Sequence, residues 1–203
     1  MRNTKLAVLG VAVLTMTLAT GCAKPPQQEI DGLNASLAAA EEAEAPQYAP
    51  DAWSAAQEAN NAVAAEVEAQ NNKFALFRSY TKAKDLIAAA NQAAAEAQSA
   101  AVAGKEAARN EANAALAAVQ ESLAAADALL AELAACRRTP KDFKKDLEGM
   151  KGMYEGYAAQ VAGIEGAIAS EDFLGAKSQA ESLQASVDGL VADLQSGKEK
   201  IKC

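Results

Sequence analysis

The spacing of apolar residues constrains this fold more than any other feature of the sequence. From about residue 29 almost to the end of the chain, apolar residues recur every three or four positions. This spacing places them on one face of an α-helix, and most of them are alanine, the residue with the highest helix propensity. No stretch alternates apolar and polar residues with the period of two that marks a half-buried strand. The sequence therefore predicts an all-α protein.

The small size of the apolar residues predicts how these helices pack. Hydrophobic residues make up 51% of the chain, but aromatic residues only 4%. Such side chains cannot fill a thick globular core, although they let helix backbones approach closely. We therefore expect elongated antiparallel helical hairpins, a coiled-coil-like bundle with one long central helix.

Residues 29–135 are predicted to form an Ala-rich helical hairpin. Its second arm extends from Tyr80 to Ala135, which as one helix would be about 80 Å long. Facing positions of an antiparallel hairpin have a constant sum, and this register places Phe77 beside Tyr80 and the large Trp53 beside the small Gly104.

The segment before the prolines is expected to lie beside the far half of the long helix. The pairing that places Trp53 beside Gly104, slipped by one residue, sets Leu33 against Leu123. Pro46 and Pro50 would then kink or break one arm of the hairpin.

Residues 136–203 are predicted to form a second hairpin. Both arms alternate spacings of four and three, with the turn at 169–172 and Ser170 as a cap. This register brings Cys136 and Cys203 together at the open end, where a disulfide would close the hairpin. The alternative is a buried Cys136 and a free Cys203 at a frayed end.

The N-terminus has the layout of a secretory signal peptide. An apolar run from Leu6 to Leu18 follows Arg2 and Lys5 and ends in small residues. Leu18-Ala19-Thr20-Gly21-Cys22 resembles the lipobox of bacterial lipoproteins. The resemblance implies that residues 1–21 are removed, that Cys22 carries the lipid (palmitate), and that residues 22–28 form a tether. An ordinary cleaved signal with an incidental cysteine is the alternative.

The predicted location is the cell envelope, anchored by lipid and facing the periplasm. Cys22 is followed by Ala23 and not by the Asp of the best-known inner-membrane retention rule, which favours the outer membrane. No later run of about 18 apolar residues is expected to span a membrane.

The charge of the chain makes some main partners unfavourable. The net charge is −8, and removing residues 1–21, which hold two basic and no acidic residues, makes it −10. An acidic chain argues against nucleic acid or an anionic lipid surface as the main partner.

The sequence offers no catalytic, metal-binding or cofactor-binding residues that we can identify. It contains no His, and its three Cys do not have the spacing of a metal site. Glycines 149, 152 and 156 lie inside the heptad pattern, so we interpret them as close-packing sites and not as a phosphate loop. Glu41, Glu42 and Glu44 could bind a cation, although such a charge run usually forms a solvated helix face.

Large side chains in two places are the candidates for partner binding. Met153, Tyr154 and Tyr157 form one patch in the second hairpin, and Tyr48 with Trp53 forms another in the first. Each patch has an alternative interpretation as part of the helical seam.

One motif resembles a known family. An Ala-rich helix leads into Tyr48-Ala49-Pro50, and Tyr80-Thr81-Lys82-Ala83 opens a second Ala-rich helix. This pattern, over residues 30–108, is similar to a family of Ala-rich bacterial envelope lipoproteins whose shared helical-hairpin domain is of unknown function. The resemblance implies envelope localisation and a helical hairpin, and it supplies no catalytic residues.

These observations lead us to expect a non-enzymatic, lipid-anchored envelope protein that acts as a structural spacer, tether or adaptor. Its partners would be the membrane, through the lipid on Cys22, and an envelope protein or a second copy of the chain. The alternative is a periplasmic binding or chaperone-like module that holds an apolar ligand or client helix in an Ala-lined groove.

Overall fold

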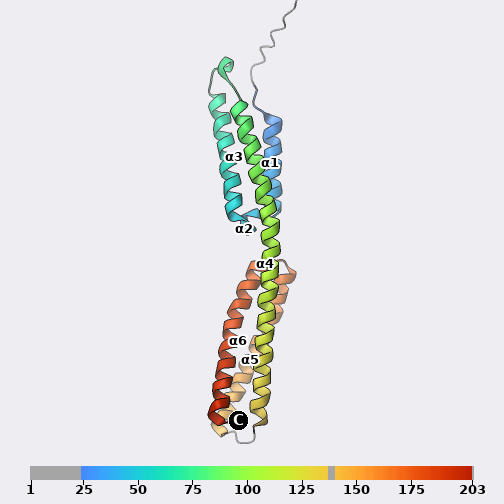
Figure 1. Ribbon diagram of the computed structural model, residues 1–203, viewed down its shortest axis with the longest axis vertical. Helices are drawn as coiled ribbons and strands as arrows, with labels where there is room; N and C mark the ends of the chain where they lie inside the picture. Colours follow the sequence, from blue (N-terminus) through green and yellow to red (C-terminus); the bar gives the residue numbers. More distant parts are fainter. Residues whose placement is uncertain (1–23, 137–139, 203) are drawn as a thin grey trace, which may run out of the picture.

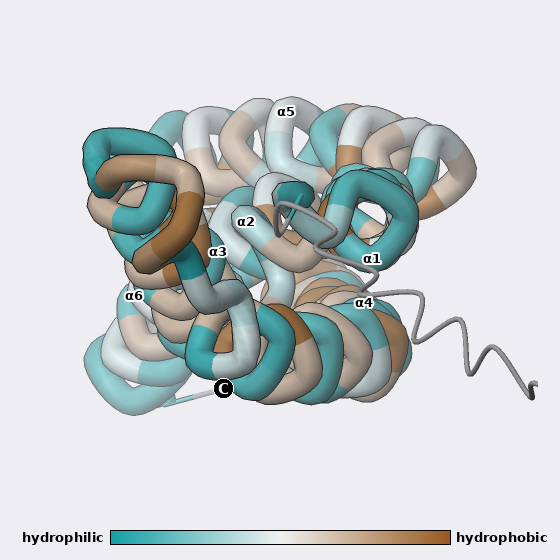
Figure 2. The backbone as a smooth tube through the Cα atoms, turned by 90° about the horizontal axis from the view of Figure 1, so that it is seen from above, coloured by the Kyte–Doolittle hydropathy of each residue, from teal (hydrophilic) through white to brown (hydrophobic). Residues whose placement is uncertain are grey.

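The computed structural model describes residues 24–136 and 140–202; residues 1–23, 137–139 and 203 lie outside the described part. Within these ranges the chain forms helices and no strand, which confirms the all-α prediction. The molecule is a rod in which one helix, α4, runs through both halves (Figure 1). Strongly hydrophobic residues are sparse along the chain (Figure 2).

Helix α4 (Thr81–Ala135) is the predicted long central helix, with 55 residues. It contains one glycine and no proline, and alanine dominates its sequence, so its whole length favours the helical conformation. It ends where predicted, because Cys136 is extended and Pro140 follows soon after.

The N-terminal bundle consists of α1 (Gln27–Glu42), α3 (Pro50–Asn71) and the first half of α4. Helix α1 runs parallel to α4, and α3 runs antiparallel to both (Figure 1). Leu33 on α1 is fully buried in a cluster with Val63 and Ile87, and Ser36 Oγ donates to Asn91 Oδ1 at 2.8 Å. The prediction that Leu33 lies beside Leu123 is therefore wrong.

The chain reverses direction at the prolines. Glu44 adopts a left-handed conformation (φ 62°) and precedes the single turn α2 (Ala45–Tyr48). Pro46 and Pro50 lie in the first turns of α2 and α3, where a missing N–H breaks no helical hydrogen bond. They begin new helices instead of kinking one arm, and this reversal returns α3 along α1.

The pairing of α3 with α4 is shifted from the predicted one. Helix α3 ends at Asn71, not at Phe77, and the connection contains the 3₁₀-helix η1 (Ala75–Phe77). Gly104 consequently faces Tyr48 and not Trp53. Alanines repeat so regularly here that a slip of two turns leaves the seam almost unchanged, and apolar spacing alone could not fix the pairing.

The C-terminal bundle consists of the second half of α4 with α5 (Lys141–Ala169) and α6 (Phe173–Ile201). The predicted α5–α6 pairing is confirmed: Ile164 and Ala176 share one buried cluster, and Gly197 faces the Phe143 ring. Helix α6 runs parallel to α4, with ion pairs such as Lys177–Glu111 that span 66 residues.

The α5–α6 turn falls where predicted, but its cap is different. Asp172, not Ser170, caps α6, because its Oδ1 accepts from the backbone N of Gly175 at 3.0 Å. Ser170 Oγ donates to the Ala167 carbonyl instead. Glu171 between them is left-handed (φ 63°).

Of the two predicted disulfide partners, the structure describes Cys136. This residue is disulfide-bonded. Cys203 lies outside the described residues, as does Cys22, so the pairing with Cys203 and the lipid on Cys22 both stay predictions.

Helix α4 is long and apolar enough to cross a membrane by length and composition alone, and in the described ranges no other helix is. This criterion tolerates charged residues, so it does not contradict the expectation that no uninterrupted run of about 18 apolar residues follows the signal, which stays a prediction. An Ala-rich core helix passes the same test, and α4 carries charged groups along its length. Its Glu111 and Glu132 form ion pairs with Lys177 and Lys198 of α6.

Candidate functional site

The two bundles meet at a narrow region that we call the waist, formed by residues 42–48, 102–109 and 168–173. Helix α4 passes alone from one bundle to the other here (Figure 1). An open groove of about 710 Å³ lies beside it, lined by apolar and charged side chains from the chain reversal before α2, from α4 and from the α5–α6 turn.

Lys105 connects three parts of the chain at the waist. Its Nζ lies 2.7 Å from Glu44 Oε2 and 2.6 Å from Glu171 Oε2. Glu44 belongs to the N-terminal bundle and Glu171 to the C-terminal bundle, and both are left-handed turn residues. We call this three-residue group the Lys105 clamp. Because each bundle contributes one carboxylate, the clamp joins both bundles to α4.

Tyr48 makes a second connection across the waist. Its hydroxyl donates to the backbone carbonyl of Glu171 at 3.3 Å. Its own carbonyl lies against Gly104, where a Cβ atom would approach the oxygen to 2.3 Å. Burial, and then the charge of Glu44, raises the pKa of Tyr48 above its ordinary value. The neutral hydroxyl is therefore kept as a donor well above neutral pH.

The charges at the waist are mutually compensated. The hydrogen bond from Lys105 lowers the pKa of Glu171, and the hydrogen bonds to Glu171 and Glu44 raise the pKa of Lys105. Both groups are consequently ionised across the neutral range, which suits a structural clamp and not proton transfer. In the described ranges no cluster of His, Cys, Asp or Glu is arranged to hold a metal ion.

The predicted partner-binding residues do not form one surface. Tyr48 lies at the waist, whereas Trp53 packs against the Ala cluster of the N-terminal bundle. Tyr154 and Tyr157 pack against both core clusters of the C-terminal bundle, and Met153 beside them is 43% exposed. The two tyrosines are therefore largely part of the helical seam.

Two features were missed from the sequence. The clamp depends on Lys105, which follows Gly104 directly in the middle of an Ala-rich helix. The loop after α3 exposes Phe74, Leu76 and Phe77. Three large apolar residues within four positions cannot all lie on one buried helical face, and that crowding was the available signal.

The chain matches no protein family, no curated protein and no solved structure. The resemblance of residues 30–108 to Ala-rich envelope lipoproteins accordingly stays an expectation.

Proposed function

We propose that this protein is a non-enzymatic, lipid-anchored spacer of the bacterial cell envelope. The observation that carries the proposal is the 55-residue helix α4, which both bundles share. A single helix of this length spans about 80 Å, so the two ends of the molecule are held far apart. The signal-peptide layout and the lipobox-like Cys22 supply the envelope location and the anchor.

The waist supports this proposal because several connections between the two bundles cross it. A continuous helix, the Lys105 clamp and the Tyr48–Glu171 hydrogen bond all cross between the bundles. A disulfide between Cys136 and Cys203 would close a loop of more than 60 residues and stabilise the far end by about 4 kcal/mol.

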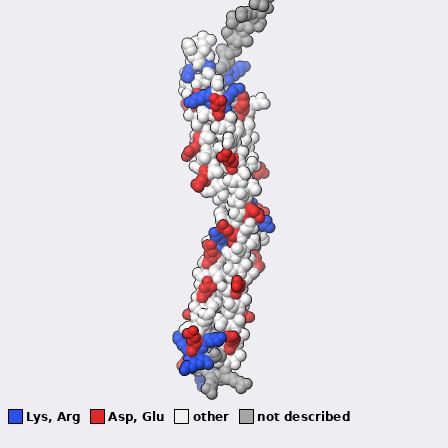
Figure 3. All heavy atoms as spheres, viewed as in Figure 1, with Lys and Arg blue, Asp and Glu red and all other residues white. Residues whose placement is uncertain are grey.

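The distribution of charge also distinguishes the ends from the shaft. Acidic residues are spread along the rod, whereas basic residues lie at both ends and near the waist, and the end opposite the tether carries one dense group of them (Figure 3). Lys198 and Lys200 lie in the last turn of α6 at that end. We infer that this far end contacts a partner, an envelope protein or an anionic polymer, and that the shaft does not.

In-cell photo-crosslinking tests the spacer role. A crosslinking residue at Lys200, at the far end, should capture one defined partner, and the capture should be lost in Cys22→Ser, which cannot be acylated. The same residue at the exposed Asp51 on the shaft is the matched control and should capture little. Equal capture at both positions, or capture only of a second copy, would contradict a spacer.

A binding module is the second candidate, and the groove at the waist favours it. With a volume of about 710 Å³ the groove is large enough for a small ligand, but six of its lining residues are charged. An amphiphile with a polar head suits that lining better than a purely apolar ligand. Binding of a fluorescent fatty acid to the wild type, lost in Val102→Glu, would favour this candidate over the spacer.

A further inference from the structure

The loop between α3 and α4 is the most hydrophobic exposed feature in the described part of the chain. Phe74, Leu76 and Phe77 are 69%, 73% and 75% exposed. The rings of Phe74 and Phe77 lie together, with centroids 6.4 Å apart. We call residues 72–80 the aromatic tip.

The aromatic tip is held in place by its flanks. Gln70 Oε1 accepts from the backbone N of Ser79 at 3.1 Å, and the Tyr80 hydroxyl donates to Asn71 Oδ1 at 2.5 Å. The Arg78 guanidinium donates to the Asn71 carbonyl at 2.7 Å, satisfying a carbonyl at the C-terminus of α3. The apolar side chains are therefore presented outward from an ordered loop.

The charge around the tip is opposite to that of the whole chain. Residues 69–84 contain four basic and no acidic residues, in a chain of net charge −8. Lys82 is paired with Glu66 from the neighbouring helix. Lys73 and Arg78, the two basic residues within the tip, flank its apolar side chains.

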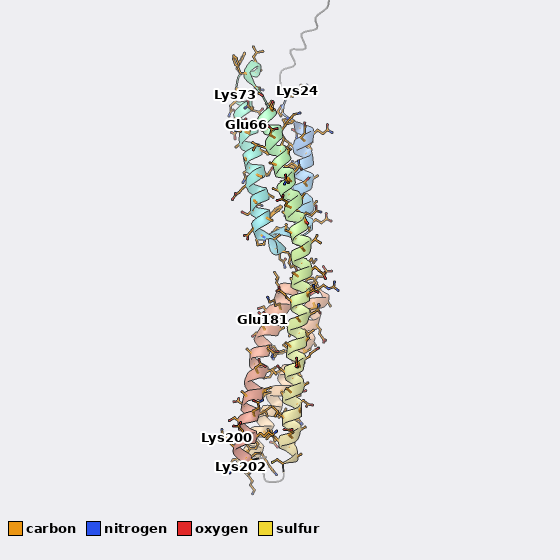
Figure 4. The ribbon with its side chains drawn as sticks, viewed as in Figure 1. Lys24, Glu66, Lys73, Glu181, Lys200 and Lys202 are labelled. Carbon is orange, nitrogen blue, oxygen red and sulfur yellow. The ribbon has the colours of Figure 1, made fainter. Side chains whose placement is uncertain are left out.

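The tip lies at the end of the rod from which the lipid tether leaves. The first turns of α1 and α4 are joined by an ion pair between Glu29 and Lys84 at 2.8 Å. Lys24 and Lys73 lie at this same end, opposite Lys200 and Lys202 (Figure 4). Two extended residues from Lys24 to Cys22 span about 7 Å at most, so an acyl chain on Cys22 would hold the tip at the membrane surface.

We propose that the aromatic tip is a second membrane anchor, which inserts into the same leaflet as the lipid on Cys22. Phe74, Leu76 and Phe77 enter the boundary between headgroups and acyl chains, and Lys73 lies at the level of anionic phosphates. Two attachments at one end stop the rod from swinging about a single anchor point and make it stand away from the bilayer. This inference rests on the proposed lipid anchor, because that anchor brings the tip to a membrane.

The observations favour a bilayer over a protein groove as the occupant. The tip is a protruding loop with basic residues beside its apolar side chains, and it lies next to the tether. The far end of the rod is also basic, but none of the described exposed large hydrophobic residues lies in the last turns of α6. Apolar and basic groups are thus combined at the tether end.

Vesicle binding tests the proposal without the acyl chain. The chain from residue 22 onward, with Cys22→Ser, retains every described residue. We expect it to sediment with vesicles of phosphatidylethanolamine and phosphatidylglycerol. The triple variant Phe74→Ser, Leu76→Ser and Phe77→Ser should weaken partitioning by more than about 100-fold, near tenfold for each side chain removed from the bilayer. Lys73→Gln should weaken it about fivefold, and only on vesicles that contain phosphatidylglycerol.

Matched variants outside the tip control for nonspecific binding of exposed apolar side chains to vesicles. Val102→Ser with Leu174→Ser removes two other exposed apolar residues and should leave partitioning unchanged. Quenching by brominated lipid should occur for Phe77→Trp and not for Val102→Trp. No vesicle binding, or equal binding by the triple and wild-type chains, overturns the proposal, as does crosslinking from the tip to protein alone. Failure of Cys22 to incorporate labelled palmitate would contradict the proposed lipid anchor instead. The vesicle experiment would still test whether the aromatic tip binds a bilayer, because it uses the chain without the acyl group.

Discussion

At the scale of single residues, Gly104 is the position where α4 tolerates no side chain. A Cβ atom there would lie 2.3 Å from the Tyr48 carbonyl oxygen, a backbone atom that cannot move aside easily. Inside a helix, glycine is otherwise a disadvantage of about 1 kcal/mol relative to alanine. The close approach of the chain reversal to α4 explains why glycine stands here.

Gly104→Ala should therefore destabilise the protein, by about 1–3 kcal/mol, because overpacking outweighs the gain in helix propensity. Gly152 is the matched control, since its Cβ would meet no atom of the described residues within 4 Å. Gly152→Ala should stabilise by about 0.5–1 kcal/mol. Urea unfolding followed by circular dichroism measures both, and a stabilising Gly104→Ala would show that Tyr48 does not lie against α4.

The clamp makes a second prediction at this scale, on the dependence of stability on pH. The folded-state pKa of Glu171 is lowered by Lys105, so its stabilising effect is present above the ordinary Glu value of about 4.3 and is lost as the pH falls through the lower folded-state value. Glu171→Gln should accordingly be less stable than the wild type at pH 5 to 8, and the difference should shrink toward pH 3.

Thermal unfolding at each pH checks this, with Glu68→Gln as a control that removes the same charge from an exposed helix position outside the clamp. A difference between Glu171→Gln and the wild type that stays constant down to pH 3 would show that Glu171 does not contribute through its ionised form.

At the scale of elements, the end of α3 decides how the N-terminal bundle pairs. Gln70 is 6% exposed, the only buried polar residue in the described ranges. Its side chain donates to Glu66 Oε1 at 2.7 Å and accepts from the backbone of Ser79. The Gln70 side chain thus joins the last turn of α3, which ends at Asn71, to the loop that leads to α4.

Gln70→Ala should destabilise the protein by about 1 kcal/mol, because the backbone N–H of Ser79 loses the side-chain oxygen that accepts its hydrogen bond. Gln98→Ala, at an exposed position of α4, should cost nothing and is the control. Hydrogen exchange at Ser79 should accelerate in the first variant only. Unchanged exchange there would mean that the loop is held by other contacts.

At the scale of the whole molecule, the relative orientation of the two bundles depends mainly on the helix that they share, α4. The cores of the two bundles lie on opposite sides of the waist, and α4 is the one helix common to both. The rest of the connection consists of polar contacts at the surface, the Lys105 clamp and Tyr48. Bending should therefore concentrate at the waist.

Ala107→Pro should bend the rod there without unfolding the bundles. Ala107 is exposed, so the substitution removes a helical hydrogen bond and no core packing. Small-angle scattering should show a shorter maximum dimension than in Ala107→Gly, with circular dichroism nearly unchanged. Adding Lys105→Met should shorten it further. An unchanged dimension in the double variant would place the rigidity elsewhere.

Several features of this protein could be predicted from the sequence because they depend on local spacing. The helical class, the long α4, the α5–α6 pairing and its turn follow from propensity and from a seam of distinct large residues such as Ile164 and Leu194. Those large side chains fit only one alignment, so their register is encoded along the chain.

Tertiary structure alone decided the rest. An alanine seam packs almost equally well after a slip of two turns, so the α3–α4 pairing depended on Gln70 and on the polar end of α3. The return of α3 along α1 depended on the left-handed conformation of Glu44, which the spacing of apolar residues does not indicate. The clamp and the aromatic tip followed from that reversal and that pairing. Both bring together residues that are distant in sequence. The spacing of apolar residues describes each helix separately and does not predict which of those residues meet in the folded chain.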